Sequence, residues 1–347
     1  MVSAAFGSHG IGVVGAGTII RHGHLPAYSH VGLRVYGVHD TDTARAEAVA
    51  METGIVATSL DELLTDDRVD VIDIGITPHA QLEVAERAIR AGKHLLCQKP
   101  LAPTLAQAVR LVELAESHGV KVAVNQQMRW EPIVACVKHA LDDGTLGEPT
   151  AALIETNMRD DFPAEHWLAR EPRLMALYGT IHFLDSARFL FGEPEWVTAH
   201  ISRDPLQTSQ GETWINAWLE WSSGFSLVIF ERYTNWAGDL TATMRVEGTR
   251  GAVRGHFGLW DDYPHRRPDV VERIAYANGE WTEISSDAAW LPDAFAGPMV
   301  GLLEALDADR DPPTSGRDNL LTLRLVEAVY RSSLERRAVR PQDIAVL

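Results

Sequence analysis

The stretch IGVVGAGTII, residues 11–20, joins a short apolar run to two glycines separated by one residue. Gly15 and Gly17 directly follow the expected strand and precede a helical stretch, which is where a phosphate-binding turn needs them. We therefore expect Gly15, Gly17 and the adjoining Thr18 and Ile19 to contact a bound dinucleotide. Taken alone, the two glycines also fit a simple tight connection between a strand and a helix.

An acidic residue at the end of the next expected strand strengthens this interpretation. Asp40 stands about 20 residues beyond Gly17, where a carboxylate accepts hydrogen bonds from ribose hydroxyls. Such a carboxylate repels a 2′-phosphate and no cation follows it directly, so the pattern predicts NAD and makes NADP less favoured. The alternative role of Asp40 is to cap the following helix. The literal G-x-G-x-x-G match at residues 10–15 is a decoy, because its glycines precede and interrupt the strand, and Ile20 replaces the third glycine.

Short apolar runs alternate with helical stretches from residue 10 to about 128. This alternation is typical of βαβ units and predicts an α/β fold with a doubly wound parallel sheet of the Rossmann type. We assign residues 1–128 to an NAD-binding domain. Its expected strands are 11–17, 34–40, 69–77, 93–100 and 120–127, and its clearest helices are 82–92 and 105–119.

The pattern changes in the second half of the chain, where strand-forming residues dominate. The glycine-containing stretches 222–224 and 247–251 are expected to be hairpin turns. We therefore expect residues 129–347 to form an α+β domain with a large, mostly antiparallel open sheet, which binds substrate and offers a surface for self-association. Its expected strands are 196–203, 213–222, 225–234, 240–248 and 251–258, and its expected helices are 131–142 and 319–336.

Composition excludes several classes of function. The net charge of -17 argues against nucleic acid or an anionic membrane as the main partner. No segment approaches the roughly 20 apolar residues of a membrane helix, and the start of the chain lacks the features of a signal peptide. Two cysteines form no disulfide framework, which favours a cytoplasmic location, and no metal-ligand spacing is present, so we expect no bound metal.

A second informative stretch is LLCQKPLAP, residues 95–103. Pro100 must end the strand, because it has no N–H for a ladder, and the chain thereby holds Lys99 at the end of that strand. Lys99 is either a catalytic or cofactor-binding ammonium or a solvated charge. Further expected cofactor contacts at the ends of neighbouring strands are Gln98, Thr77, Pro78, His79 and Asn125.

Taken in order, these segments resemble the Gfo/Idh/MocA oxidoreductases, named after glucose-fructose oxidoreductase, inositol dehydrogenase and a rhizopine-catabolism protein. The resemblance implies a Rossmann domain followed by an open-sheet domain that often forms homodimers or homotetramers. It also implies NAD(P)-linked oxidation or reduction of a hydroxyl or carbonyl group on a sugar or cyclitol. The matching segments are GVVGAGTI (12–19), Asp40, TP (77–78), AIRAGKHLLCQKPLAPTLAQA (88–108), RW (129–130), GTLGEP (144–149) and IHFLDSARFLFGEP (181–194).

The resemblance implies two reactive residues and shows two departures. Lys99 matches a lysine that lies near the nicotinamide in the family's Glu-Lys-Pro motif, and His182 matches the histidine of a second motif. Gln98 replaces the usual glutamate, which is similar to a QKP-type branch of the family. Tyr178 stands where an aspartate is usual. If residues 178–190 are helical, Tyr178, His182 and Asp185 share one face.

Chemistry requires an acid/base group beside the reacting hydroxyl, because its proton must leave when the hydride leaves the carbon. We expect Lys99 and His182 to be the acid/base pair and Tyr178 to position substrate. An alternative for His182 is a core histidine bonded to Asp185. A neutral Gln98 would leave the pKa of Lys99 lower than a glutamate would.

Several residues are expected to contact a polyol or sugar acid, because arginine forks bind hydroxyls and carboxylates and aromatic faces cover C–H surfaces. For each of them, packing or an ion pair is the alternative. The residues are Arg129, Trp130, Arg159, His166 and Trp167.

Three functions remain open from the sequence. The first is an NAD-dependent sugar or cyclitol dehydrogenase. The second is a sensor that keeps the nucleotide fold without turnover, which the Tyr178 departure permits. The third is a glycosidase that uses transient oxidation to drive elimination.

Overall fold

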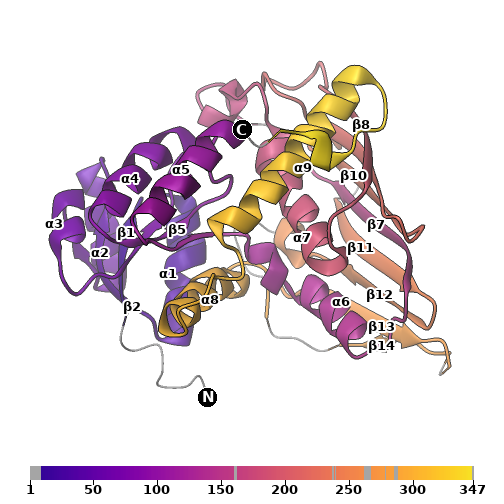
Figure 1. Cartoon of the computed structure of the whole chain (residues 1–347), viewed down its shortest axis with the longest axis horizontal. Coiled ribbons are helices and arrows are strands. Elements are labelled where there is room, and N and C mark those ends of the chain that lie inside the picture. Colours follow the sequence, from indigo (N-terminus) through magenta and orange to yellow (C-terminus); the bar gives the residue numbers. More distant parts are fainter. Residues whose placement is uncertain are drawn as a thin grey trace. The chain divides into compact units, whose positions relative to one another are not determined.

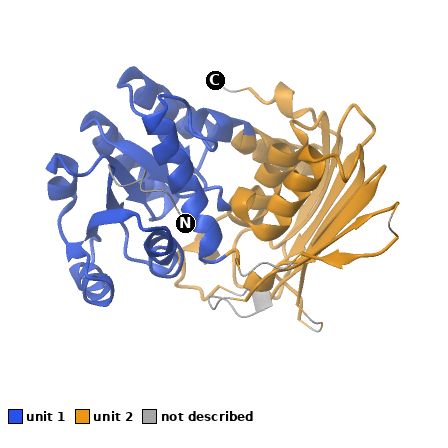
Figure 2. Cartoon of the chain, turned by 90° about the horizontal axis from the view of Figure 1, so that it is seen from below, with its two compact units in different colours: residues 1–127, 291–321, 346–347 blue, residues 128–290, 322–345 orange. Residues whose placement is uncertain are grey.

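The computed structural model describes residues 9–159, 162–236, 238, 240–261, 267–277, 279–284 and 288–345, which form two compact units (Figure 2). The first unit contains the chain up to Gln127 together with Leu291–Leu321. The second contains Met128–Trp290 and Thr322–Ala345. Within the described ranges, no helix is long and apolar enough to cross a membrane.

The first unit is built on a six-stranded, fully parallel sheet with the strand order β3-β2-β1-β4-β5-β6. This order confirms the predicted doubly wound sheet, and the order reverses between β1 and β4, where such sheets bind their ligands. The two-residue strand β3 was not predicted. The strands are β1 (Gly10–Val14), β2 (Arg34–His39), β3 (Val56–Ala57), β4 (Val71–Ile74), β5 (His94–Cys97) and β6 (Val122–Val124).

Helices cover both faces of this sheet, with α4 beside α5 on one side and α1 beside α8 on the other (Figure 1). Apolar side chains between the layers, such as Ile72 and Leu95, are 0% exposed, and each contributes roughly 1.5–3 kcal/mol through its burial. The helices are α1 (Leu25–Val31), α2 (Thr43–Thr53), α3 (Leu60–Thr65), α4 (Pro78–Arg90), α5 (Leu105–Ser117) and α8 (Ala296–Asp307).

The placement of α8 corrects the predicted domain boundary, which assigned all of 129–347 to the second domain. Residues 291–321 instead pack with the first unit, where α8 contacts β5 and β6. The apolar face of a helix shows that the helix covers a sheet, but its pattern does not identify which sheet.

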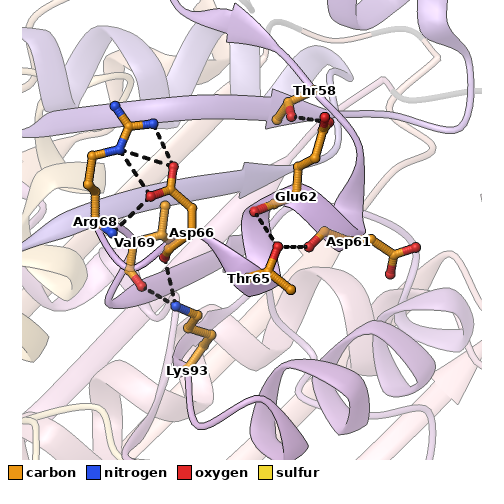
Figure 3. A network of polar contacts seen from close by, with 8 residues as sticks. All are labelled: Thr58, Asp61, Glu62, Thr65, Asp66, Arg68, Val69 and Lys93. Atoms are coloured by element: carbon orange, nitrogen blue, oxygen red, sulfur yellow. Dashed lines mark hydrogen bonds and ion pairs between the residues drawn. The ribbon is translucent and has the colours of Figure 1, made fainter.

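A polar network around α3 aligns the starts of β4 and β5 (Figure 3). Ser59 and Glu62 form a capping box at the N-terminus of α3. At the other end, the ammonium of Lys93 donates to the carbonyl oxygens of Asp66 and Val69 at 2.9 and 2.7 Å. Lys93 of the AGKH segment therefore has a structural role in the connection that leads into β4.

The second unit is built on an eight-stranded sheet in the order β14-β13-β12-β11-β7-β10-β9-β8. Among the described strands, only β7 and β10 pair in parallel, so the predicted, mostly antiparallel sheet is confirmed. The predicted turns at 222–224 and 247–251 connect β9 to β10 and β11 to β12. The strands are β7 (Pro149–Asn157), β8 (Trp196–Ser202), β9 (Trp214–Glu220), β10 (Ser226–Arg232), β11 (Thr241–Gly248), β12 (Gly251–His256), β13 (Val270–Ala275) and β14 (Thr282–Glu283).

Helices lie against one face of this sheet (Figure 1). They are α6 (Pro132–Asp142), α7 (Ile181–Phe191) and the part of α9 (Gly316–Glu335) that belongs to this unit. Burial alternates along β10, where Leu227 and Ile229 are 0% exposed and Val228 is 41% exposed. One face of the sheet therefore holds the core, and the other carries exposed side chains.

Candidate active site

The two glycines after β1 serve different structural purposes. Gly15 has a φ of 109°, and a Cβ atom there would lie 2.5 Å from the carbonyl oxygen of Gly75, so no other residue fits without strain. A Cβ atom on Gly17 would meet nothing within 4 Å. Gly17 thus keeps an open approach to the backbone, which is the property that a pyrophosphate needs at this position.

Ile20 replaces the third glycine of the fingerprint, and Gly75, which follows the neighbouring strand β4, compensates for this replacement. A Cβ atom on Gly75 would lie 2.4 Å from the Cδ1 atom of Ile20. The third glycine allows close packing of helix and strand, and here Ile20 packs closely because residue 75 has no side chain. Ile20 also begins η2 (Ile20–His24), a single π-helical turn that leads into α1.

Asp40 closes the other side of the turn. Its Oδ2 atom accepts a hydrogen bond from the backbone N–H of Ala16 at 2.8 Å, and its Oδ1 atom accepts one from the N–H of Asp42. The nearest following cation, Arg45, forms an ion pair with Asp42 at 3.1 Å. The open Gly17, a carboxylate at the ribose position and a paired Arg45 fit NAD better than a 2′-phosphate.

The loop that carries Lys99 is held by one buried side chain that the sequence did not single out. The Nε2 atom of Gln81, on α4, donates to the carbonyl oxygens of Gln98, Pro100 and Leu101 at 2.9, 3.2 and 3.0 Å. Its Oε1 atom accepts from the N–H of Gln98 at 2.9 Å. Gln81 is 0% exposed, so it fixes the backbone on both sides of Lys99.

The other predicted cofactor contacts of this unit lie at the same sheet edge. Thr77 and Pro78 start α4 directly after β4, and His79 follows in its first turn. Asn125 follows β6, where its backbone N–H donates to the carbonyl oxygen of Cys97 at 2.8 Å. The carboxyl ends of β1, β4, β5 and β6 therefore bring together the turn, the Lys99 loop and Asn125.

In the second unit, the expected helix over 178–190 starts in a π turn rather than in an α-helical one. α7 begins at Ile181, and Tyr178 lies before it in η5 (Ala176–Thr180), a single π-helical turn. That Tyr178, His182 and Asp185 share one face was expected for a regular α-helix, and it stays a prediction because Tyr178 lies in the π turn. Single π turns occur frequently at functional positions.

The surroundings of Tyr178 oppose its ionisation. Burial raises the pKa of the phenol, and the carboxylate of Glu171, which hydrogen-bonds to it, raises the pKa further. The ring of Trp167 meets the Tyr178 ring edge-on at 5.3 Å. A neutral phenol that donates a hydrogen bond suits the positioning role expected for Tyr178.

His182 lies in the first turn of α7 and is 9% exposed. The indole ring of Trp290 meets its imidazole edge-on, with centroids 5.5 Å apart and an angle of 90° between the planes. The carbonyl oxygen of His182 accepts from Ser186 at 2.8 Å. Packing thus restricts the orientation of the imidazole ring.

Arg129, expected to bind substrate, forms a buried ion pair. Its Nε and Nη2 atoms donate to the two carboxylate oxygens of Asp185 at 2.7 and 2.8 Å, and Thr322 donates to the same carboxylate. Asp185 is 0% exposed and Arg129 is 8% exposed. This bidentate ion pair favours the structural alternative for Arg129, in which its guanidinium anchors α7 through Asp185.

The remaining predicted substrate residues make other contacts. Trp130 ends the short helix η3 (Gln127–Trp130), and the guanidinium of Arg159 stacks on the ring of Trp236 at 5.3 Å. His166 is exposed and caps η4 (Trp167–Arg170), so its ring is placed by the helix it precedes. Trp167 is the member of this set that contacts Tyr178.

Sequence reasoning missed several residues that support the site: Gln81, His24, Asp73, Tyr28 and Glu171. One of them, Asp73, could have been recognised from the sequence. Asp73 interrupts the apolar strand VIDI and is 0% exposed, and a buried carboxylate requires hydrogen-bond partners. Within the described ranges, no group of three or more His, Cys, Asp or Glu side chains is placed to hold a metal ion.

Comparison with known proteins agrees with this architecture. Residues 9–126 match the model of an oxidoreductase family with an NAD-binding Rossmann fold, and residues 134–254 match the GFO/IDH/MocA C-terminal domain. A D-apiose dehydrogenase from Paraburkholderia graminis is 32% identical over 96% of this chain and 89% of its own length. An inositol 2-dehydrogenase from Rhizobium meliloti is 26% identical over 94% of this chain and 98% of its own.

Among solved structures, an Agrobacterium radiobacter oxidoreductase in complex with NAD+, L-tartaric acid and magnesium has a TM-score of 0.82. It is 23% identical, with 97% of this chain and all of the other covered, so it supports the fold. The family match confirms the predicted NAD cofactor. The chain belongs to the Gfo/Idh/MocA family of NAD-binding oxidoreductases.

Proposed function

We propose that this protein is an NAD-dependent dehydrogenase that acts on a hydroxyl or carbonyl group of a sugar, sugar acid or cyclitol. The observation that carries the proposal is the fixed loop around Lys99. Gln81 holds this loop through three carbonyl oxygens and one N–H, at the sheet edge that also carries Gly17 and Asp40. A solvated lysine at a strand end needs no such support. The relatives named as D-apiose and inositol dehydrogenases support the class of substrate.

The proposed chemistry divides between the cofactor and the protein. Bound NAD supplies the hydride acceptor or donor. Gly15, Gly17, Thr18, Ile19 and Asp40 hold its pyrophosphate and ribose. Lys99 and His182 move the hydroxyl proton, because oxidation of an alcohol requires that proton to leave with the hydride.

The contacts of the second unit support separate roles for its two reactive residues. His182 is restricted by Trp290 and offers an imidazole, the side chain that most often acts as a general acid or base. Tyr178, held neutral by burial and by Glu171, positions a substrate oxygen. Trp167 covers the C–H surface of the substrate, and Trp130 and Arg159 contribute to the same substrate contacts. Gln98, in place of the usual glutamate, supports assignment of the protein to a QKP-type branch.

The test is incubation with NAD and a panel of pentoses, hexoses, sugar acids, cyclitols and glycosides, with NADH absorbance as the readout. Net NADH from one member supports the proposal. Glycoside cleavage without net NADH supports the transient-oxidation alternative. If no compound yields NADH or is cleaved, and the protein still binds NADH, the result supports the sensor and overturns the dehydrogenase.

With a substrate identified, Lys99→Met, His182→Asn and the double variant test the acid/base roles. Residues that act on one step are strongly non-additive, so the double variant should lose little more activity than the worse single variant. Additive losses would contradict the shared proton transfer. Retained NADH affinity in each variant shows that the first unit is intact.

We further propose that the protein assembles as a homodimer or homotetramer through the exposed face of the second sheet, and that it acts in the cytoplasm. Leu153, Val228 and Trp218 lie side by side in register on β7, β10 and β9, and they are 41, 41 and 47% exposed. Adjacent exposed apolar side chains mark association surfaces. Sedimentation velocity of Trp218→Glu should show a smaller species than the wild-type protein, and an unchanged species would contradict this surface.

A further inference from the structure

A buried polar cluster lies behind the Lys99 loop in the first unit. His24, at the end of the π turn η2, is 0% exposed, as are Asp73 and Asn125. The Nδ1 atom of His24 lies 2.8 Å from the Oδ2 atom of Asp73, and Tyr28 donates to the same oxygen at 2.8 Å. On the other side of the ring, Nε2 lies 3.2 Å from the amide nitrogen of Gln98 and 3.1 Å from that of Asn125.

The direction of these hydrogen bonds follows from one backbone contact. The N–H of Lys99 donates to the Oε1 atom of Gln98 at 2.8 Å, so the Nε2 atom of Gln98 must be the atom that faces His24. An amide nitrogen can only donate, and therefore the Nε2 atom of His24 must accept. The imidazole proton then resides on Nδ1, where it is donated to Asp73.

The same logic fixes the amide of Asn125. Its nitrogen donates to His24, so its Oδ1 atom points the other way. This oxygen is buried, and among the described residues it has no hydrogen-bond partner. A buried acceptor without a partner is costly unless a ligand satisfies it.

We propose that His24, held as the Nδ1–H tautomer by Asp73, is a positioning residue that orients Gln98 against the Lys99 backbone and presents Asn125 Oδ1 to the carboxamide N–H of nicotinamide. This assignment rests on the proposed NAD-dependent function. Asn125 follows β6, in the half of the sheet that binds the nicotinamide end of a dinucleotide. The ring of Phe295, 5.3 Å from His24, packs against the imidazole and restricts its rotation.

The cluster also explains why residue 98 is a glutamine in this chain. A glutamate at 98 would place a carboxylate oxygen 3 Å or so from an imidazole nitrogen that has no proton. His24 would then have to take a second proton or transfer its proton away from Asp73. The identity of residue 98 and the tautomer of His24 are therefore coupled.

The first test reads the tautomer in the protein without cofactor, so it is independent of any activity. Two-bond proton–nitrogen NMR correlations distinguish Nδ1–H from Nε2–H imidazoles, and the His24→Gln variant identifies the His24 signals by their loss. The wild-type protein should show Nδ1–H, and Gln98→Glu should show a doubly protonated or Nε2–H ring. An Nε2–H ring in the wild-type protein would overturn the proposal whether or not the protein is a dehydrogenase.

The second test measures binding of NAD and of its 3-acetylpyridine analogue, which lacks the carboxamide N–H. The wild-type protein should prefer NAD by about fivefold, the worth of one hydrogen bond. Asn125→Ala should abolish this preference, and His24→Leu should reduce it.

His24→Gln keeps an acceptor for the two amides and should restore part of the preference. An equal preference in the wild-type protein and Asn125→Ala would show that Asn125 does not contact the carboxamide. If the wild-type protein bound neither NAD nor the analogue, the result would instead contradict the proposed function.

Discussion

In the first unit, amide groups hold the loop that carries Lys99, whereas in the second unit buried charges hold the segment that carries Tyr178 and His182. Gln81 and Gln98 bind backbone atoms of the Lys99 loop. Around Tyr178, Glu212 accepts the N–H groups of Leu174 and Ala176, and Glu231 accepts from Thr180. The Arg129–Asp185 pair anchors α7 behind them.

The two units therefore tolerate different conditions. Amides do not titrate, so the contacts of Gln81 with the Lys99 loop do not themselves depend on pH. Carboxylates and their partners keep their geometry only while their protonation states persist, and a broken buried ion pair leaves an uncompensated charge. We therefore expect the second unit to respond more strongly to pH and to the loss of a single charged side chain.

The largest effect should come from Arg129→Ala, which leaves the buried carboxylate of Asp185 without its main cation. The free energy of unfolding should fall by about 4 kcal/mol. All ten tryptophans lie between residues 130 and 290 and hence in the second unit, so tryptophan fluorescence during urea unfolding reports on this unit. Arg331→Ala, which breaks an exposed pair with Glu335, is the control and should change stability by less than about 0.5 kcal/mol. Similar losses in both variants would remove the contrast between the units.

A somewhat smaller effect on stability is expected from Gln81→Met, which introduces an apolar side chain of similar length. Three carbonyl oxygens lose a donor and the N–H of Gln98 loses an acceptor, so the Lys99 loop should be destabilised by about 3 kcal/mol. Hydrogen exchange of the segment 98–104, measured by mass spectrometry, should accelerate.

The variant Gln81→Glu keeps the acceptor but lacks the donors. Hydrogen exchange of its segment 98–104 should be faster than in the wild-type protein and slower than in Gln81→Met. Unchanged exchange in both variants would show that the loop is held by other contacts.

A third prediction concerns pH and the buried pair Glu131 and Asp269. Burial raises the pKa of Glu131 well above its ordinary value of 4.5, and the nearby Asp269 carboxyl raises it further. The folded protein then binds a proton that the unfolded chain releases, so stability is full below pH 4.5 and falls as pH rises through the folded pKa. The loss should be at most about 1.4 kcal/mol per pH unit for one proton.

Glu131→Gln keeps a hydrogen-bonding side chain but cannot ionise, and its unfolding midpoint should fall less with rising pH. Thermal unfolding followed between pH 5 and 9 measures this difference. Parallel pH dependences in the two proteins would mean that another group carries the effect.

The smallest effect is expected from Tyr178→Phe. Because burial and Glu171 raise the pKa of the phenol, the group stays protonated across the neutral range and contributes one hydrogen bond. We expect kcat/KM to fall by about fivefold, or about 1 kcal/mol, with both limbs of the pH profile unchanged. Disappearance of a limb would show that Tyr178 itself titrates. Tyr276→Phe, an exposed tyrosine in the same unit, serves as the control.

Local patterns predicted much of this structure. Gly15, Gly17 and Asp40 could be proposed as cofactor contacts because a phosphate turn and the ribose position depend on the order of strand, turn and helix along the chain. The hairpin turns at 222–224 and 247–251 were identified for the same reason, since turn chemistry is local. Each of these features lies in one short segment or repeats at a fixed spacing.

The remaining features depend on contacts between distant segments. Asp73 was visible as a carboxylate in an apolar strand, but its partner His24 lies 49 positions away. No periodicity connects Gln81 to the Lys99 loop. The π turn that contains Tyr178 lies where Glu212 accepts the Ala176 N–H and Glu231 accepts from the Thr180 hydroxyl, and these partners are distant in the sequence.

The return of residues 291–321 to the first unit has a consequence for synthesis on the ribosome. The edge strand β6 completes its pairing with residues near Ser315, through a bridge from Ala123 and a bond from the Val124 N–H to the Thr314 carbonyl. At 5–20 residues per second, these partners emerge roughly 190 residues later, after a delay of about 10–40 s. During this interval the nascent chain exposes an open sheet edge that invites association with other chains. Protection by a chaperone at this stage would therefore matter more than it does for a domain whose sheet is closed by contiguous sequence.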